Sequence, residues 1–262
     1  MPPADAEPYR TSLGTSSPDV IRLLGHDLTE ELMGSVSFAD LAFWLVALRR
    51  PTAGESRLFN AVLVALTDHG FTPIVLAARL TLLGAPEAVQ GAMAAGLLGG
   101  GSRFLGTTED TAAFLADGLA REPGRADPDA LAADLVRERK AAHRTVPGLG
   151  HPLHKDGDPR TPVIHRIAEE EGVAGPHLDL LAAVGRVHPA ILGRTLPVNG
   201  AGVCGAALAD LGIPPGLVRG VALVARSAGI LGHLAEEMRD PIGRRVYDSV
   251  DRNAVYVAPD PG

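Results

Sequence analysis

The 262-residue chain carries 31 acidic residues against 24 Lys and Arg, giving a formal net charge of −7. This charge gives no electrostatic support to a nucleic-acid partner or an anionic membrane, so we expect neither. Hydrophobic residues make up 46% of the chain, which is ordinary for a globular protein, and its single cysteine, Cys204, rules out an internal disulfide. One cysteine suits a reducing compartment, so we expect a cytoplasmic protein. The acidic, proline-rich start and the lack of a long apolar stretch argue against a signal peptide or a membrane span.

Taken in order, the chain predicts helices joined by short breaks. Residues 1–28 are polar with few periodic apolar positions, and we expect an arm that is either unstructured or wrapped on a partner subunit. Thr29 is the expected N-cap of the first helix, because acidic residues follow it in the turn where the helix dipole favours them. Ser37 repeats the N-cap signal ahead of 38–48, which is apolar nearly all round and predicts a buried helix.

Apolar residues at helical spacing predict the further helices. They cover 55–67, 75–83, 86–98, 108–120, 128–139, 162–171, 176–184, 202–211 and 215–237. Proline and glycine make 121–128 linker-like, 239–245 is basic and irregular, and 254–258 is the one plausible strand. The predicted fold class is therefore all-α.

Titratable groups concentrate in one loop, which runs from Pro147 to Arg160 and is interrupted by glycine and proline. An imidazole beside the amides of a glycine-rich loop can polarise a carbonyl or transfer a proton near pH 7, which makes His151 a candidate for catalysis. The alternative is an ordinary histidine facing solvent. His151 and His154 have no cysteine or carboxylate pattern of the zinc type beside them, so we expect no metal site.

Two arginines are candidates for binding a carboxylate. Arg226 interrupts an apolar helix, and a buried arginine needs an anionic partner. Arg160 follows Asp158-Pro159 and can either grip a carboxylate with two nitrogens or form an ordinary ion pair. Two arginines that converge on one pocket would suit a di- or tricarboxylate.

Three other features are weaker. The Asp68-His69 step ends an apolar helix, where a contact with the helix dipole also explains a histidine. The glycines at 99–101 are not a phosphate-binding loop, because no strand precedes them and no Gly-Lys-Ser/Thr follows. Cys204 lies among alanine and glycine and is expected to be inert core.

Together these residues resemble the citrate synthase superfamily. The Gly-Leu-Gly-His151 and Asp158-Pro159-Arg160 segments are similar to its Gly-x-Gly-His and Asp-Pro-Arg signature at matching separation. Asp68-His69-Gly70 is similar to its Asp-His-Gly step, and Arg226 falls in its late Ser/Ala-Arg-Ala-x-Gly helix. The resemblance extends from about residue 29 to 245. It implies an all-α fold that closes on a C4 to C6 carboxylate and coenzyme A, in a homodimer or higher homo-oligomer.

The resemblance also implies domains and site residues. A large domain would comprise 29–103 and 205–262, and a small domain 104–204. Catalysis is assigned to His151, His69 and Asn199, carboxylate binding to Arg160, Arg226, Arg245 and Arg103, and contacts with coenzyme A to the backbone of Gly148, Leu149 and Gly150 and to Lys155. Arg244 or Arg245 would reach the site of a neighbouring subunit. His154 has no role in this scheme.

The chain departs from the condensing enzymes of the family at two positions. Gly99 stands where those enzymes carry a histidine, and the turn is closer to the citryl-CoA-cleaving module of ATP citrate lyase, which also reads Gly-Leu-Leu and then Arg-Phe. The family's catalytic aspartate falls on Asn199, whose amide cannot exchange a proton but can donate a hydrogen bond to an enolate oxygen.

Three functions follow from the resemblance. We expect a citryl-CoA lyase-like enzyme that cleaves a 3-hydroxy-3-carboxyacyl-CoA, such as citryl-CoA, to acetyl-CoA and an oxo acid such as oxaloacetate. The first alternative is a citrate synthase-like enzyme that condenses an acyl-CoA with an unusual 2-oxo acid. The second is a catalytically retired relative that binds only coenzyme A or a carboxylate.

Overall fold

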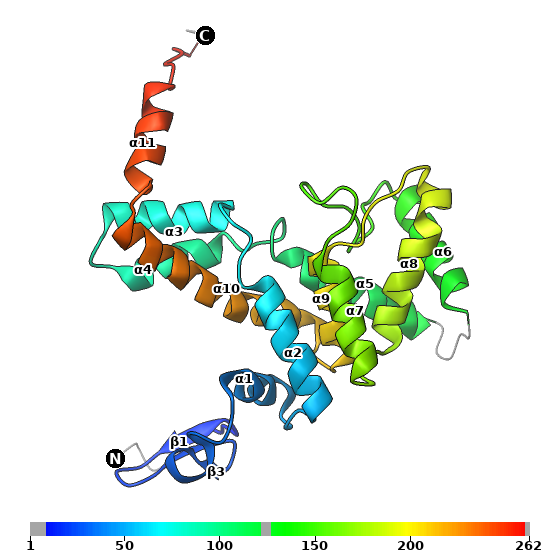
Figure 1. The fold of residues 1–262 in the computed structure, drawn as a ribbon, viewed down its shortest axis with the longest axis horizontal. Helices are drawn as coiled ribbons and strands as arrows, with labels where there is room; N and C mark the ends of the chain where they lie inside the picture. Colours follow the sequence, from blue (N-terminus) through cyan, green and yellow to red (C-terminus); the bar gives the residue numbers. More distant parts are fainter. Residues whose placement is uncertain (1–8, 122–126, 260–262) are drawn as a thin grey trace.

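The computed structural model describes residues 9–121 and 127–259 (Figure 1). Helices dominate this part of the chain, which confirms the predicted all-α class. In chain order they are α1 Phe38–Ala47, α2 Ala53–Leu66, α3 Pro73–Gly84, α4 Val89–Leu98, α5 Gly106–Arg121, α6 Pro128–Ala141, α7 Arg160–Glu170, α8 Pro176–Leu192, α9 Gly200–Asp210, α10 Pro215–Arg239 and α11 Gly243–Arg252. Most of the linker predicted at 121–128 lies outside the described residues.

The N-terminal arm differs from the prediction, because it forms a small antiparallel sheet. Its strands are β1 Gly14–Ser16, β2 Ile21–Leu23 and β3 His26–Asp27. The turn from β2 to β3 consists of Leu24 and Gly25, both at positive φ, which is the geometry of tight hairpins. The sheet leads into a single helical turn, η1 Leu28–Leu32.

Three local predictions fail, two of them because a preceding carboxylate caps the first turn of a helix. Asp27, not Thr29, caps η1 and accepts from the amides of Thr29 and Glu30. The basic stretch predicted to be irregular contains the start of α11, whose first amides donate to the carboxylate of Glu237. The strand predicted at 254–258 does not form, since no neighbouring strand pairs with it in the described chain.

Two helices differ in extent or burial. Ser37 caps α1 as predicted, but Phe38 is 75% exposed and only one face of the helix is buried. The helix predicted at 176–184 continues as α8 through Pro189, because burial of Leu181, Val184 and His188 outweighs the low helix propensity of proline.

The buried side chains form two hydrophobic clusters. The larger one joins α1, α2, α5 to α9 and the first half of α10. The smaller one joins α3, α4 and the second half of α10 through Ile74, Leu82, Ile230 and Leu234. Figure 1 shows α10 running from one group of helices to the other, with α11 projecting from the end of the smaller group. The division into domains at 29–103, 104–204 and 205–262 stays a prediction.

Among the described helices, α10 is long and apolar enough to cross a membrane by length and composition alone. Its buried side chains include Arg226 and Glu237, and it packs against both hydrophobic clusters. This arrangement is that of a core helix.

Candidate active site

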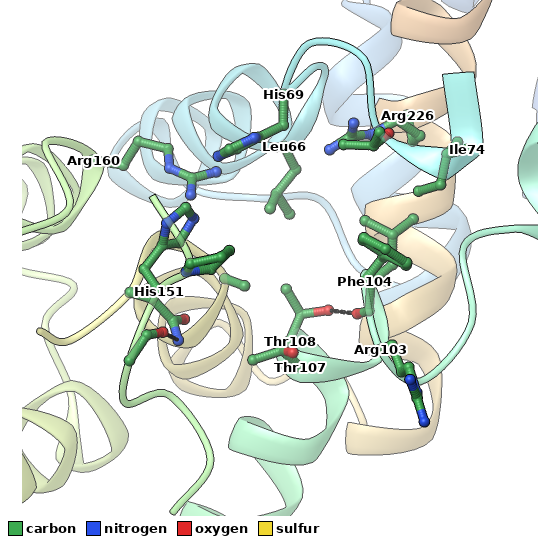
Figure 2. Close-up of a pocket in the computed structure, with 16 residues that line it drawn as sticks. Leu66, His69, Ile74, Arg103, Phe104, Thr107, Thr108, His151, Arg160 and Arg226 are labelled. Carbon is green, nitrogen blue, oxygen red and sulfur yellow. Dashed lines mark hydrogen bonds between the residues drawn. The ribbon is translucent and has the colours of Figure 1, made fainter. Parts of the chain in front are cut away.

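A cavity of about 230 Å³ lies where the two hydrophobic clusters meet. Its polar wall contains His69, His151, Arg160, Asn199 and Arg226, and its apolar wall contains Leu66, Ile74, Phe104, Leu105 and Ala201. Figure 2 shows His69, Arg160 and His151 on one side and Phe104 and Ile74 facing them. Within the described chain no aspartate or glutamate lines this cavity. The structure thus brings together five polar residues that the sequence singled out, from four separate segments of the chain.

The glycines before His151 allow its loop to lie against the start of α9. Gly148 and Gly150 have φ of 82° and 85°, a left-handed conformation that other residues rarely adopt. The Gly150 amide donates to the Pro197 carbonyl at 2.7 Å, and the Asn199 amide donates to the Gly148 carbonyl at 2.9 Å. The Gly150 amide is therefore already bonded to the segment that precedes α9.

Hydrogen bonds determine which ring nitrogen of His151 carries the proton. Its Nδ1 accepts from the amides of Leu153 at 3.1 Å and His154 at 2.9 Å. Nδ1 is therefore unprotonated, and in the neutral ring the proton lies on Nε2. Burial and the neighbouring His154 lower the pKa of His151, which favours this neutral form. The ring can donate Nε2–H to an oxygen in the cavity.

Arg160, the first residue of α7, forms the ion pair that the sequence left open as an alternative. Its Nε donates to Asp158 Oδ1 at 3.0 Å and its Nη2 to Asp158 Oδ2 at 2.8 Å. Burial opposes ionisation of Asp158, but hydrogen bonds from Arg160 and the Gly200 amide hold the pKa of that carboxyl well below its usual range. A third N–H bonds the Ala65 carbonyl, so two of the five guanidinium N–H groups remain for a ligand.

Arg226 is a buried cation with unsatisfied donors. It is 4% exposed, and its Nε and Nη1 have no hydrogen-bond partner among the described residues. The nearest carboxylate oxygen is Asp68 Oδ1, 3.9 Å from Nη1. Burial lowers the pKa of the guanidinium, since it disfavours the charged form. Figure 2 shows the guanidinium directed into the cavity beside His69, where an anion would satisfy it.

Three imidazoles gather at the polar wall. The ring centroids of His69 and His151 are 5.2 Å apart, and the ring of His154 lies 4.5 Å from His151 and 5.8 Å from His69. The sequence gave His154 no role, and its position depends on how the loop folds back. The three rings are close enough to hold a metal ion. However, a ligating Nε2 of His151 would move the ring proton to Nδ1, where two amides already donate. The expectation of no metal stays a prediction.

Asn199 has a structural position as the N-cap of α9. Its Oδ1 accepts from the Gly202 amide and its Nδ2 donates to the Gly150 carbonyl, each at 2.7 Å. The side chain therefore ties the loop of His151 to α9, and one N–H of the amide is left for the cavity.

The remaining predicted residues lie at the rim or outside the cavity. Arg103 borders it, but Figure 2 shows its guanidinium directed away. Lys155 is exposed in the loop, Leu149 pairs with Val198 in an isolated bridge, and Arg245 is exposed on α11. Their roles in binding stay predictions.

Gly99 is closely packed. A Cβ at this position would lie 3.3 Å from the Cα of Ile74, so a larger side chain here would require that neighbour to shift by a few tenths of an ångström.

Several solved structures are similar to this one in fold. The structure of citryl-CoA lyase from Hydrogenobacter thermophilus superposes with a TM-score of 0.85 and 28% identity, covering 97% of this chain and 96% of that one. ATP citrate lyase from Methanothrix soehngenii, solved with citrate and coenzyme A, gives a TM-score of 0.78 at 20% identity, and the match covers 98% of this chain but 42% of that one. Citrate synthase from Pyrobaculum aerophilum gives 0.67 at 20% identity, over 86% of this chain and 54% of that one.

The two structures at 20% identity support the fold alone, and no curated protein matches the sequence. The family model described as the C-terminal domain of citrate synthase matches residues 21–246, which is most of the chain. The signature residues His151, Arg160 and Arg226 lie within this match and face one cavity. The chain therefore belongs to the citrate synthase family.

Proposed function

We propose that this protein is a citryl-CoA lyase-like enzyme that cleaves a 3-hydroxy-3-carboxyacyl-CoA, such as citryl-CoA, to acetyl-CoA and an oxo acid such as oxaloacetate. The observation that carries the proposal is the unsatisfied Arg226, which faces the same cavity as the Nε2–H of His151 and the ring of His69. Buried guanidinium donors without hydrogen-bond partners are costly unless a ligand supplies acceptors, and the carboxylate of Asp68 stays 3.9 Å away. Similarity to a citryl-CoA lyase over nearly the whole chain supports the same reaction.

The two arginines would hold the carboxylates of the acyl group. Arg226 offers Nε and Nη1, which have no other partner in the described chain. Arg160 offers the two N–H groups that Asp158 and Ala65 leave unused. Charge-assisted hydrogen bonds of this kind fix the orientation of a carboxylate.

Cleavage transfers one proton from oxygen to carbon. His69 takes the proton of the substrate hydroxyl, since its ring makes no hydrogen bond to the described residues, while His151 donates Nε2–H to the same oxygen. The carbonyl of the oxo acid forms, the adjacent C–C bond breaks, and its electron pair moves to the thioester as an enolate. The remaining N–H of Asn199 stabilises the enolate oxygen. Protonation of the enolate carbon by the His69 imidazolium then gives acetyl-CoA.

The two alternative functions are condensation and binding without turnover, and the assay described below distinguishes both from cleavage. Condensation of acetyl-CoA with another 2-oxo acid would use the same groups in reverse. A retired relative is favoured by one observation, namely that Asn199 is occupied as a cap and no carboxylate lines the cavity in the described chain. Such a protein would bind coenzyme A or a carboxylate without turnover.

The proposal also includes the cofactor, the assembly and the compartment. The reaction uses coenzyme A thioesters as substrate and product and needs no other cofactor. Exposed apolar side chains on α2, α4 and the α2–α3 turn, such as Val64, Leu98 and Phe71, support a homodimer or higher homo-oligomer. The buried, unpaired Cys204 fits the cytoplasm.

The test is release of acetyl-CoA and oxaloacetate from synthetic citryl-CoA by the purified protein. We expect equal amounts of both products, and loss of turnover in His151→Gln but not in His143→Asn, a matched change at an exposed histidine outside the cavity. Absence of turnover in a folded protein that still binds coenzyme A would contradict the proposal and leave the retired relative. Thiol release from acetyl-CoA with a panel of 2-oxo acids, without any release of acetyl-CoA from citryl-CoA, would instead favour condensation.

A further inference from the structure

A hydrogen-bonded chain of side chains leads to the cavity from α3. Arg79, 1% exposed, donates from Nη1 to Glu237 at 2.8 Å and from Nη2 to Nδ1 of His233 at 2.9 Å, and it also bonds Glu236. Nε2 of His233 lies 3.0 Å from Oδ1 of Asp68, the residue before His69. None of these contacts belongs to the catalytic scheme above.

The direction of each hydrogen bond follows from Arg79. A guanidinium only donates, so Nδ1 of His233 accepts and carries no proton. The neutral ring therefore has its proton on Nε2 and donates it to Asp68. Arg79 cannot turn away readily, because it is buried and paired with Glu237. His233 is thus held as a donor that points at Asp68.

Asp68 lies between His233 and Arg226 but forms a hydrogen bond only with His233. Its Oδ1 is 3.0 Å from His233 and 3.9 Å from Nη1 of Arg226, and its Oδ2 accepts from the Gly70 amide at 2.8 Å. A hydrogen-bonded ion pair with Arg226 would need the 3.9 Å gap to shorten to about 2.9 Å. The side chain of Asp68 needs to move by only about 1 Å to neutralise the free arginine of the cavity.

Close packing of α10 sets this spacing. A Cβ at Gly229 would lie 2.0 Å from the Thr67 carbonyl and 3.5 Å from Asp68, so only glycine allows α10 to approach the turn this closely. Arg226 and His233 lie on either side of Gly229 on the same helix and both face Asp68. The carboxylate is therefore within reach of both side chains.

We propose that His233 is a positioning residue that holds Asp68 away from Arg226 and so keeps the Arg226 guanidinium free for a substrate carboxylate. This inference rests on the proposed function, in which Arg226 binds the substrate. Without the Nε2–H of His233, Asp68 pairs with Arg226, and the substrate must first break that ion pair. The substitution His233→Leu then weakens substrate binding through a residue that does not line the cavity.

The first test is structural and independent of activity. In a crystal structure of the ligand-free His233→Leu variant, we expect Asp68 Oδ1 within hydrogen-bond distance of Arg226 Nη1. An unchanged gap near 3.9 Å would overturn the inference. His233→Gln is the matched control, because its carbonyl can accept from Arg79 and its amide can donate to Asp68. The glutamine variant should keep the separation found in the parent protein. If the leucine variant does not fold, the glutamine variant is studied alone, and closure of the gap between Asp68 and Arg226 despite its donor would overturn the inference.

The second test is a double-mutant cycle on the KM for citryl-CoA. His233→Leu should raise KM about ten- to hundredfold, the range for breaking a hydrogen bond to a charged group, with a smaller effect on kcat. The same substitution in an Asp68→Asn background should have almost no effect on KM, because no carboxylate remains to capture Arg226. A KM penalty that persists in that background would mean that His233 acts by another route. If the parent protein has no turnover, the proposed function fails, while the crystal structure still decides whether His233 restrains Asp68.

Discussion

Replacing Arg226 by methionine should stabilise the protein while weakening substrate binding. The guanidinium is almost fully buried, and Nε and Nη1 have no hydrogen-bond partner in the described chain. Each buried donor without a partner costs about 1–3 kcal/mol. Replacing buried charges by apolar side chains of similar volume raises stability by about 1–4 kcal/mol. We therefore expect the free energy of unfolding of the ligand-free variant to rise by about 2 kcal/mol, which is about 4–8 °C in Tm for a chain of this size.

The assay is urea unfolding without ligand, followed by the fluorescence of Trp44, the one tryptophan, which is buried. Binding should change in the opposite direction, with KM for citryl-CoA rising about a hundredfold or more, as expected when a charged partner is removed from a buried pair. Arg166→Met, at an exposed arginine on α7, is the matched control and should change neither quantity appreciably. A lower free energy of unfolding for Arg226→Met would contradict this prediction, since it would mean that Arg226 stabilises the fold and is not kept for a ligand.

Three further predictions concern the polar wall of the cavity. His151→Gln should lower kcat by about 10²–10⁴-fold in the citryl-CoA assay, because it removes the donor to the reacting oxygen, and an unchanged kcat would remove His151 from the mechanism. In an NMR titration the pKa of His151 should lie below the usual 6.5, and it should rise in His154→Gln because the neighbouring imidazole is removed. Since the folded protein then binds this proton less readily than the unfolded chain, stability should fall as the pH drops below 6.5. A normal or raised pKa of His151 would contradict this. Gly200→Ala places a Cβ 2.2 Å from Nε of Arg160 and should raise KM and lower Tm, whereas Gly220→Ala, where the added Cβ meets nothing within 4 Å, should not.

The sequence predicted the fold class, and it singled out several residues that line the candidate cavity, because these signals are local. Apolar residues at helical spacing depend only on the helix that contains them, and most predicted helices lie within a few residues of the observed ones. Arg226 is visible as a charge inside an apolar helix. The glycines before His151 indicate a backbone conformation that other residues rarely adopt, and Gly148 and Gly150 do have positive φ.

What the sequence could not predict depends on contacts between distant residues. His233 and Asp68 are 165 residues apart, and only the close approach of α10 to the turn brings them together. The start of α11 depends on the carboxylate of Glu237, which is buried against Arg79 of α3, 158 residues away. His154 reaches the other imidazoles because the loop folds back on His151. Asn199 matches a catalytic position in sequence, but its amide is already bonded on both sides.

We propose that this cavity cleaves a C–C bond next to a thioester and protonates the resulting enolate. The most direct measurement is turnover of synthetic citryl-CoA in D2O, with mass analysis of the acetyl-CoA released. We expect one deuterium in the acetyl methyl group, an equal amount of oxaloacetate, and release about a hundredfold slower with Arg226→Met at the same substrate concentration, set below the KM of the parent protein. Acetyl-CoA without deuterium, or release no faster than with the Arg226→Met protein, would contradict the proposal.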